Sequence, residues 1–258
     1  MFPIPKIIHL TYKSLEEIPD KWKDVLLAWK KFYPDWEIRF WNDNDNEKLI
    51  TENFPWFIDT WNNFPYIIQK IDAVRACYLY LFGGLYMDMD YLPLKSINEL
   101  FENNDCELYF TQSSNVPTFT NSLMASKPGQ NFWITYLESM QGEKFPWYYT
   151  KHFIVMHSTG PMKLDRLLKK HQGIIGYIPA NLVHPCSVCD KSCKSVNSYF
   201  QTLDGRTWNS NDSKILNYVY CNYKNILLVI FFLLVILIIY IKYRFYKCGI
   251  CERKLQTI

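Results

Sequence analysis

The 258-residue chain contains no run of five or more basic residues, and its formal net charge at pH 7 is only +3. Nucleic-acid-binding proteins concentrate Lys and Arg on one stretch or face, so this charge pattern argues against a nucleic-acid partner. The first residues, MFPIPKIIHLTYK, lack the basic start and long apolar run of a signal peptide. No internal repeat or low-complexity linker is present, and the composition of 49% hydrophobic and 21% charged residues is typical of a globular protein.

One long hydrophobic run is present near the C-terminus. Residues 226–241, ILLVIFFLLVILIIYI, contain no charged residue, Gly or Pro. As a helix they would extend roughly 24 Å, at the short end of what a bilayer requires. We therefore predict three parts: a globular domain over residues 1–222, a transmembrane anchor over 223–243 and a short basic tail with two cysteines over 244–258.

Three of the eight cysteines lie close together before this run. Cys186, Cys189 and Cys193 are spaced C-x2-C-x3-C, and His184 precedes them. A zinc knuckle is one interpretation, but no second ligand pair lies at the usual spacing. A disulfide in a lumenal loop and free thiols are the other two interpretations, and we favour them.

Short apolar runs alternate with stretches of helical spacing over the globular part. We expect strands at residues 6–12, 36–42, 85–90, 106–112, 153–158 and 174–183. We expect helices at 22–33 (capped by Asp20), 67–81, 131–140 and 162–171. This alternation predicts an α/β sandwich with a mainly parallel sheet.

The helix at 67–81 and the residues after it carry the strongest chemical signal. One apolar stripe runs along this helix: Ile67, Ile71, Val74, Tyr78 and Leu81. Asp72 and Arg75 lie on its flank, one turn apart. Gly83 and Gly84 end the helix as a left-handed cap would, and LYMDMD follows as a strand.

Two aspartates in this strand, Asp88 and Asp90, point to the same face because side chains alternate. Their α-carbons would be roughly 6.7 Å apart, so the two carboxylates are suited to different ligands. One would ligate a divalent ion, and the other would accept from a sugar hydroxyl or a water. A polar edge strand is the alternative. A second D-x-D, Asp43 and Asp45 in WNDNDN, lies among polar residues in a predicted turn, and we interpret it as structural.

The stretch DAVRACYLYLFGGLYMDMD resembles the D-x-x-R…G-G-x-Y-x-D-x-D signature of glycosyltransferase family 32. Other segments are similar to that family as well: IPKIIHLTYK, WEIRFWNDND, NSLMASKPGQNFW, STGP and DGRTWN. The resemblance covers about residues 4–210 and is weakest at the end. It implies a GT-A fold, a nucleotide-sugar donor, a Mn2+ or Mg2+ ion and retention of the anomeric configuration.

The resemblance also implies roles for individual residues. Asp72, Arg75, Asp88 and Asp90 would be catalytic, with Asp88 and Asp90 holding the metal and ribose. Asp72 and Arg75 would bind the donor sugar and its phosphate, beside Tyr86 of the signature. Tyr12 would stack on the base, and Trp208 would close over the diphosphate. Relatives often carry His and Ser before that last Trp; here Asp204, a candidate third metal ligand, and Thr207 are nearest.

The chemistry supports these roles independently of the resemblance. Carboxylate oxygens suit a hard divalent cation, which stabilises the charge of a departing diphosphate. Arg75 is suited to clamp a phosphate, and its alternative is a simple ion pair with Asp72. Thr159, Gly160 and Pro161 open a helix whose N-terminus is either an anion site or a plain cap.

Several functions remain open at this stage. We expect a hexosyltransferase that moves mannose from GDP-mannose onto a glycolipid such as inositol phosphoceramide, or onto a glycan. A UDP-galactose or UDP-glucose donor is the alternative. A sugar-binding membrane protein without catalysis and a D-x-D phosphatase are less favoured, because Asp90 is not followed by the Thr or Val that the phosphatase motif requires.

The location of the globular domain is open too. Lys242, Arg244 and Lys247 follow the hydrophobic run, so the positive-inside rule places the tail in the cytosol and the domain in the lumen of the ER or Golgi. The missing signal peptide favours the reverse, as in tail-anchored proteins. We favour the lumen.

Overall fold

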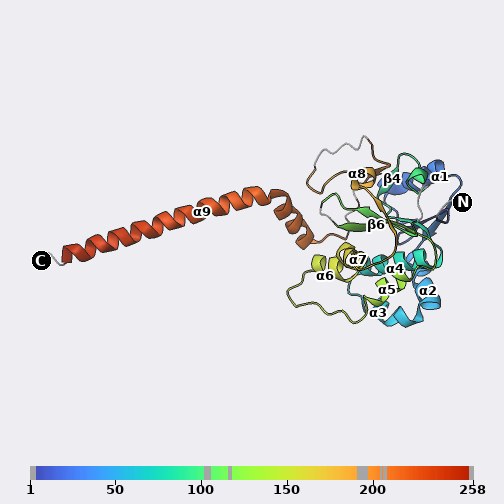
Figure 1. Cartoon of the computed structure of the whole chain (residues 1–258), viewed down its shortest axis with the longest axis horizontal. Coiled ribbons are helices and arrows are strands. Elements are labelled where there is room, and N and C mark those ends of the chain that lie inside the picture. The colour runs from blue at the N-terminus through green and yellow to red at the C-terminus, as the bar shows by residue number, and fades with distance from the viewer. Residues whose placement is uncertain are drawn as a thin grey trace. The chain divides into compact units, whose positions relative to one another are not determined.

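The computed structural model describes residues 4–101, 106–115, 118–190, 197–203, 205 and 208–255. The chain divides into two units, Met1–Asp212 and Ser213–Ile258. The first unit holds all the strands of the described residues, and the described residues of the second lie in one long helix (Figure 1).

The first unit is built on a six-stranded sheet in the order β2-β1-β3-β6-β5-β7. Three neighbouring pairs are parallel, β1–β2, β1–β3 and β5–β7, whereas β6 runs antiparallel to both of its neighbours. The strands are β1 (Ile7–Thr11), β2 (Glu37–Trp41), β3 (Gly84–Met87), β5 (Leu108–Gln112), β6 (Phe119–Ser126) and β7 (Ile175–Ile178). The predicted α/β sandwich with a mainly parallel sheet is confirmed.

Helices cover both faces of this sheet (Figure 1). The first unit contains α1 (Lys23–Phe32), α2 (Asp43–Asn53), α3 (Ile58–Asn63), α4 (Ile67–Leu81), α5 (Asn131–Glu138), α6 (Lys151–Ser158), α7 (Pro161–Leu168) and α8 (Ala180–Val183). Leu85 and Met87 pack with α1 on one face, and Tyr86 packs with α4 and α5 on the other. This alternation is the one that the period of two predicts.

Four local predictions are wrong, each for a physical reason. Residues 153–158 form α6 rather than a strand, because Val155 and Ser158 are buried three apart instead of two. Asp20 does not cap α1; its carboxylate pairs with Lys23. Ile67 is 62% exposed, so the expected stripe of α4 does not reach its start. Residues 43–46 begin α2 instead of forming a free turn.

Other expected elements are present with shifted ends. Helices begin at Asn131 and Pro161, close to the expected positions, and end earlier than predicted. The segment 174–183 is a strand only to Ile178 and then forms α8. Gly83 and Gly84 have φ of 64° and 87°, as a left-handed cap requires. A side chain at Gly84 would meet the carbonyl oxygen of Ile7 at 2.5 Å, so the helix-to-strand turn depends on glycine.

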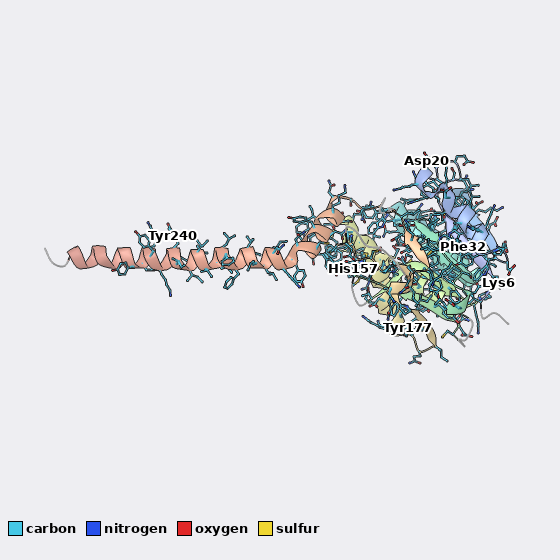
Figure 2. All side chains as sticks on the ribbon, turned by 90° about the horizontal axis from the view of Figure 1, so that it is seen from above. Lys6, Asp20, Phe32, His157, Tyr177 and Tyr240 are labelled. Carbon is cyan, nitrogen blue, oxygen red and sulfur yellow. The ribbon has the colours of Figure 1, made fainter. Side chains whose placement is uncertain are left out.

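The second unit lies in α9 (Asn211–Leu255). The stretch Asn211–Tyr246 of this helix is long and apolar enough to cross a membrane, and its most apolar window is not buried by the rest of the chain. Figure 2 shows the side chains of α9, Tyr240 among them, projecting from the helix on several sides.

His9, a residue of strand β1, is polar and fully buried. Its Nδ1 accepts from the indole of Trp41 at 3.1 Å, so the proton is on Nε2, which donates to the carbonyl of Gly83 at 2.9 Å. The ring stacks on Tyr78 at 5.3 Å. Burial, partly opposed by the bond to Gly83, lowers the pKa of His9 to about 4. The structure therefore holds His9 neutral.

We expect His9 to make the fold acid-sensitive. A lowered folded-state pKa contributes stability that is complete above the unfolded value near 6.5 and is lost as pH falls towards 4. The loss is about 3 kcal/mol. Urea unfolding of the Met1–Asp212 unit at several pH values measures it. His9→Gln keeps a donor and an acceptor but does not titrate, so its stability should fall less below pH 6.5. Parallel pH curves for the two proteins would contradict this account, because His184, which titrates similarly, is common to both.

Candidate active site

Three parallel strands end at one edge of the sheet. β1 ends at Thr11, β2 at Trp41 and β3 at Met87, so Tyr12, Asp43 and Asp88 follow at the same edge. The start of β6 lies beside them, and the amide of Asp88 donates to the carbonyl of Ser122 at 2.9 Å. Ligands of open α/β sheets bind at this carboxyl edge.

The D-x-D pair lies in a turn and not on a strand, which corrects the expected strand at 85–90. β3 ends at Met87, and the amide of Tyr91 donates to the carbonyl of Asp88 at 3.4 Å. The chain then enters β4 (Tyr91–Pro93), which pairs with β8 (Phe200–Thr202) in a separate two-stranded sheet. Because the chain passes from one sheet to the other here, Asp88 and Asp90 do not occupy alternate positions of one strand.

Arg75 links the carboxylates of this edge. Its Nη2 lies 3.1 Å from Oδ1 of Asp88, and its Nη1 lies 3.3 Å from Oδ1 of Asp72. Nη1 also donates to the carbonyl of Asn121 at 2.9 Å. The guanidinium lies 4.8 Å from the centre of the Tyr86 ring, on its face. Within the described residues its Nε has no hydrogen-bond partner, although Arg75 is only 4% exposed.

Asp72 is held from both sides. Oδ1 accepts from the side-chain amide of Asn121 at 2.9 Å, and Oδ2 accepts from the hydroxyl of Thr159 at 3.0 Å. Burial raises the pKa of Asp72 to about 6, while Arg75 opposes that rise. The donors of Asn121 and Thr159 thus hold the Asp72 carboxylate in place beside Arg75.

Asp88 and Asp90 differ in surroundings. Oδ1 of Asp88 accepts from the hydroxyl of Tyr86 at 2.7 Å, and 29% of the Asp88 side chain is exposed. Asp90 is tied to the C-terminal part of the unit, since its carbonyl accepts from the amide of Leu203 at 2.7 Å. A Cβ on Gly205 would lie 1.9 Å from Oδ2 of Asp90, so the chain can pass this carboxylate only as glycine.

Two carboxylates are a suitable but incomplete donor set for Mn2+ or Mg2+. Such ions take oxygen ligands, and Mg2+ is usually held by one or two protein carboxylates plus phosphate and water. No group of three or more His, Cys, Asp or Glu that could hold a metal is present among the described residues. Asp204, the predicted third ligand, lies outside those residues.

Gly205 allows a direct test of the contact with Asp90. We expect Gly205→Ala to displace the Asp90 carboxylate and to weaken Mn2+ binding by at least tenfold, because the added methyl has no room. Circular dichroism should show a folded protein. Gly129→Ala is a control for backbone strain without a clash, since nothing lies within 4 Å of its Cβ position but its φ of 74° disfavours a side chain. Unchanged Mn2+ binding by Gly205→Ala would show that Asp90 tolerates displacement or does not contribute to metal binding.

Tyr12 and Trp208, the two aromatic residues expected at the donor, contact different elements. Tyr12 follows β1 directly, is partly buried and packs edge-on against Trp22 at 5.6 Å. Trp208 stacks on His152 at 5.6 Å, and its carbonyl accepts from Lys151 at 2.8 Å. It therefore lies at the start of α6, a helix of about 12 Å whose far end leads to Thr159.

Three residues of the cluster were not singled out for these contacts from the sequence: Asn121, Thr159 and Gly205. Asn121 begins the family-like segment NSLMAS, which was the only signal for it. Thr159 precedes α7 as expected, but its hydroxyl binds Asp72. In the second D-x-D, Asp45 completes a capping box with Asn42, which confirms a structural role for that residue.

Cys186 and Cys189 are disulfide-bonded. The zinc-knuckle and free-thiol interpretations are therefore wrong for these two residues. Cys193 lies outside the described residues.

Comparisons with known proteins agree with this geometry. Residues 19–107 match the family described as glycosyltransferase sugar-binding region containing DXD motif. The chain is 28% identical over 217 residues to inositol phosphoceramide mannosyltransferase 2 of Schizosaccharomyces pombe, covering 83% of this chain and 60% of that protein. It is 28% identical over 257 residues to the mannosyl phosphorylinositol ceramide synthase SUR1 of Saccharomyces cerevisiae, covering 99% and 64%.

The fold has a counterpart among solved structures. The UDP-bound glycosyltransferase domain of the YGT toxin superposes with a TM-score of 0.51 at 10% identity, covering 69% of this chain and 80% of that domain. The first unit thus has a GT-A-like α/β fold with a mixed, mostly parallel sheet. The chain carries the DXD sugar-binding region of family 32 glycosyltransferases and is a distant homologue of the fungal inositol phosphoceramide mannosyltransferases. It spans 60% and 64% of the length of the two relatives named.

Proposed function

We propose that the protein is a metal-dependent, retaining glycosyltransferase that uses a nucleotide-sugar donor, with GDP-mannose favoured and a UDP-hexose as the alternative. The observation that carries the proposal is the Arg75 cluster. A nearly buried guanidinium joins Asp72 to Asp88 at the carboxyl edge of the sheet, one turn of chain from Asp90. Its Nε, unpaired within the described residues, is a donor for a phosphate or sugar oxygen.

Each residue of the cluster has a distinct task in this proposal. Asp88 and Asp90 would hold Mn2+ or Mg2+, which supplies charge stabilisation to the departing diphosphate. Arg75 binds the donor phosphate or sugar oxygen, and Tyr86 supports its guanidinium. Asp72, saturated by Asn121 and Thr159, is a positioning residue that fixes Arg75. Preorganised charge of this kind costs no rearrangement during the reaction.

The second unit and the disulfides support a choice of acceptor and location. The long apolar helix supports a membrane anchor, and the two relatives act on a ceramide lipid by name. We infer a glycolipid acceptor of the inositol phosphoceramide class, with a glycan as alternative. Disulfides persist in oxidising compartments, so Cys186 and Cys189 support a lumenal domain in the ER or Golgi.

Two experiments test this function. The full chain, in vesicles that contain inositol phosphoceramide and Mn2+, should transfer labelled mannose from GDP-mannose faster than galactose or glucose from the UDP-sugars. Absence of both transfer and hydrolysis over the whole donor panel would contradict an enzymatic role. Protease protection of the first unit in sealed vesicles tests the orientation; digestion without detergent would place the domain in the cytosol.

Tyr12 is the proposed stacking residue for the donor base. Stacking of a base on an aromatic ring is worth about 1–3 kcal/mol, so we expect Tyr12→Ala to raise the donor KM by about one to two orders of magnitude. Tyr12→Trp should keep most of the activity, because the indole provides a larger ring. Steady-state kinetics with varied donor measures both. An unchanged KM for Tyr12→Ala would exclude stacking, and loss of folding would indicate a purely structural role beside Trp22.

A further inference from the structure

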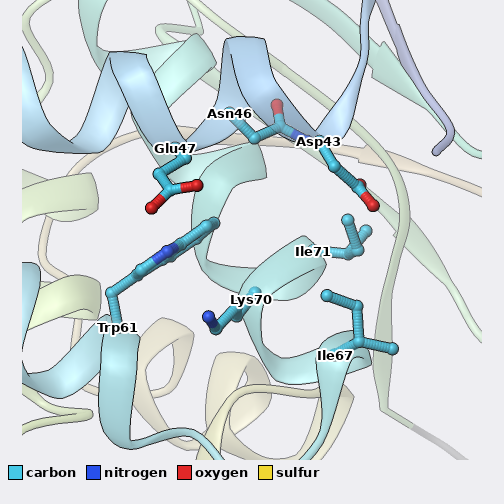
Figure 3. A pocket seen from close by; sticks show the side chains of 7 residues that line it. All are labelled: Asp43, Asn46, Glu47, Trp61, Ile67, Lys70 and Ile71. Atoms are coloured by element: carbon cyan, nitrogen blue, oxygen red, sulfur yellow. The ribbon is translucent and has the colours of Figure 1, made fainter. Parts of the chain in front are cut away.

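A shallow pocket opens beside the first turn of α2 (Figure 3). Its volume is about 100 Å³, between α2, α3 and α4. In Figure 3, Ile67 and Ile71 form an apolar wall near Asp43, Trp61 and Glu47 lie on the other side, and Lys70 lies between the two sides. The pocket therefore combines two carboxylates and one ammonium group with apolar and aromatic surface, which is the composition of a site for a flat polar ligand.

The position of Asp43 relates this pocket to the proposed donor site. The amide of Asp43 donates to the carbonyl of Lys13 at 3.2 Å, and the amide of Tyr12 donates to the carbonyl of Trp41 at 3.2 Å. Asp43 and Tyr12 thus follow two adjacent strands at the same edge. Asp88 follows the next strand, β3, so two strand spacings, roughly 10 Å, separate it from Asp43. A ribose and a diphosphate bridge a distance of this size.

The carboxylate of Asp43 makes neither of the two bonds of the capping box that starts α2. Asn42 and Asp45 make both bonds of the capping box. Asn46, although it lines the pocket, is committed to Thr11 and Tyr78. In Figure 3 the carboxylate of Asp43 lies towards Ile71, on the pocket side of the helix. Asp43 is thereby the acidic acceptor at this end of the pocket.

A half-buried carboxylate discriminates between nucleobases. Guanine presents two adjacent donors, N1–H and the 2-amino group, and these match the two oxygens of a carboxylate. Uracil offers one N–H between two carbonyl oxygens. One carboxylate oxygen can accept from this N–H, but the other then faces a carbonyl oxygen, which repels it. Asp43 is partly buried, so water has limited access to its carboxylate, and this burial raises the pKa of Asp43. Its hydrogen bonds to a base therefore meet less competition from solvent.

We propose that Asp43 is the specificity-determining residue for the donor base, accepting from N1–H and the 2-amino group of guanine while Tyr12 stacks on the ring. This inference rests on the proposed transferase function and extends it to the choice of nucleotide. It also assigns different roles to the two members of the second D-x-D: Asp45 is structural, and Asp43 accepts hydrogen bonds from the base.

The test measures binding of four nucleoside diphosphates to the full chain in detergent with Mn2+, by calorimetry. The wild type should bind GDP at least tenfold more tightly than IDP, which lacks the 2-amino group, and than UDP. Asp43→Asn replaces one acceptor oxygen with a donor. It should lower the affinity for GDP by roughly 10- to 100-fold. It should raise the affinity for XDP, the xanthosine diphosphate, whose 2-carbonyl accepts from the new amide. UDP binding should change little.

Asp45→Asn is the matched control, because it lies two residues away in the same helix turn and should keep the wild-type preference. An unchanged ratio of GDP to XDP affinity in Asp43→Asn would overturn the inference and leave the transferase function standing. A wild type that prefers UDP would overturn it as well, while supporting a UDP-hexose donor. If the wild type bound none of the four nucleotides, the proposed function itself would fail and the inference with it.

Discussion

Asp88→Asn and Asp90→Asn are each expected to lower donor turnover by about two to three orders of magnitude while the protein stays folded. Asn keeps the shape and one oxygen of the carboxylate but removes the charge that a divalent ion requires. Loss of one preorganised electrostatic partner in the transition state costs about 3–4 kcal/mol, which corresponds to that change in rate. Hydrolysis of the donor by purified protein, with circular dichroism of each variant, measures the effect.

The two variants should differ in rescue by metal. Asp90 has its backbone carbonyl bound to Leu203, whereas the Asp88 carboxylate also contacts Arg75 and Tyr86. Raised Mn2+ should therefore restore more activity to Asp90→Asn than to Asp88→Asn, because the substitution of Asp88 also removes the charge that lies 3.1 Å from Nη2 of Arg75. Asp45→Asn is the control from the second D-x-D and should stay within a few fold of the wild type. Full activity in both the 88 and the 90 variants would show that the metal site is elsewhere.

Arg75→Met is expected to destabilise the first unit by about 3–5 kcal/mol. Removing one partner of a buried charge network leaves uncompensated charge on the others, here Asp72 and Asp88. The free energy of unfolding in urea measures the loss. The double variant Arg75→Met with Asp72→Asn should recover part of it, because one of the two stranded carboxylates is then neutral.

Arg39 provides the matched control for this substitution. It pairs with Glu37 at 2.6 Å, but on the surface, where 55% of the Glu37 side chain is exposed. Arg39→Met should therefore cost less than about 1 kcal/mol. If Arg75→Met were no more destabilising than Arg39→Met, the cluster would not be the tightly held, charge-compensated site described above.

The sequence predicted the layers of the fold because the period of the apolar residues determines them. Ile8, Leu10 and Leu85 face one side, and the glycines after α4 have the positive φ that their position indicated. Residues 153–158 were mistaken for a strand because a short apolar run such as FIVMHS fits both periods. Only its packing, through Val155 and Ser158, distinguishes the two.

Contacts of the candidate site between residues close in sequence could be predicted, whereas contacts between residues distant in sequence could not. Asp72 and Arg75 lie one helical turn apart, so their ion pair could be expected from the sequence. The contacts of Asp72 with Asn121 and Thr159 join residues 49 and 87 positions away. No spacing rule predicts contacts over such separations. The same holds for Gly205 beside Asp90, and for the turn that takes the D-x-D off the strand when the chain changes sheets.

The most direct test of the central claim is anomalous X-ray scattering from Mn2+ in crystals of the Met1–Asp212 unit grown with GDP. We predict one manganese peak between the carboxylates of Asp88 and Asp90, with the diphosphate bound to it and Arg75 Nη or Nε within hydrogen-bond distance of a phosphate oxygen. A bound nucleotide whose manganese lies on other carboxylates, or whose diphosphate does not approach Arg75, would contradict the account.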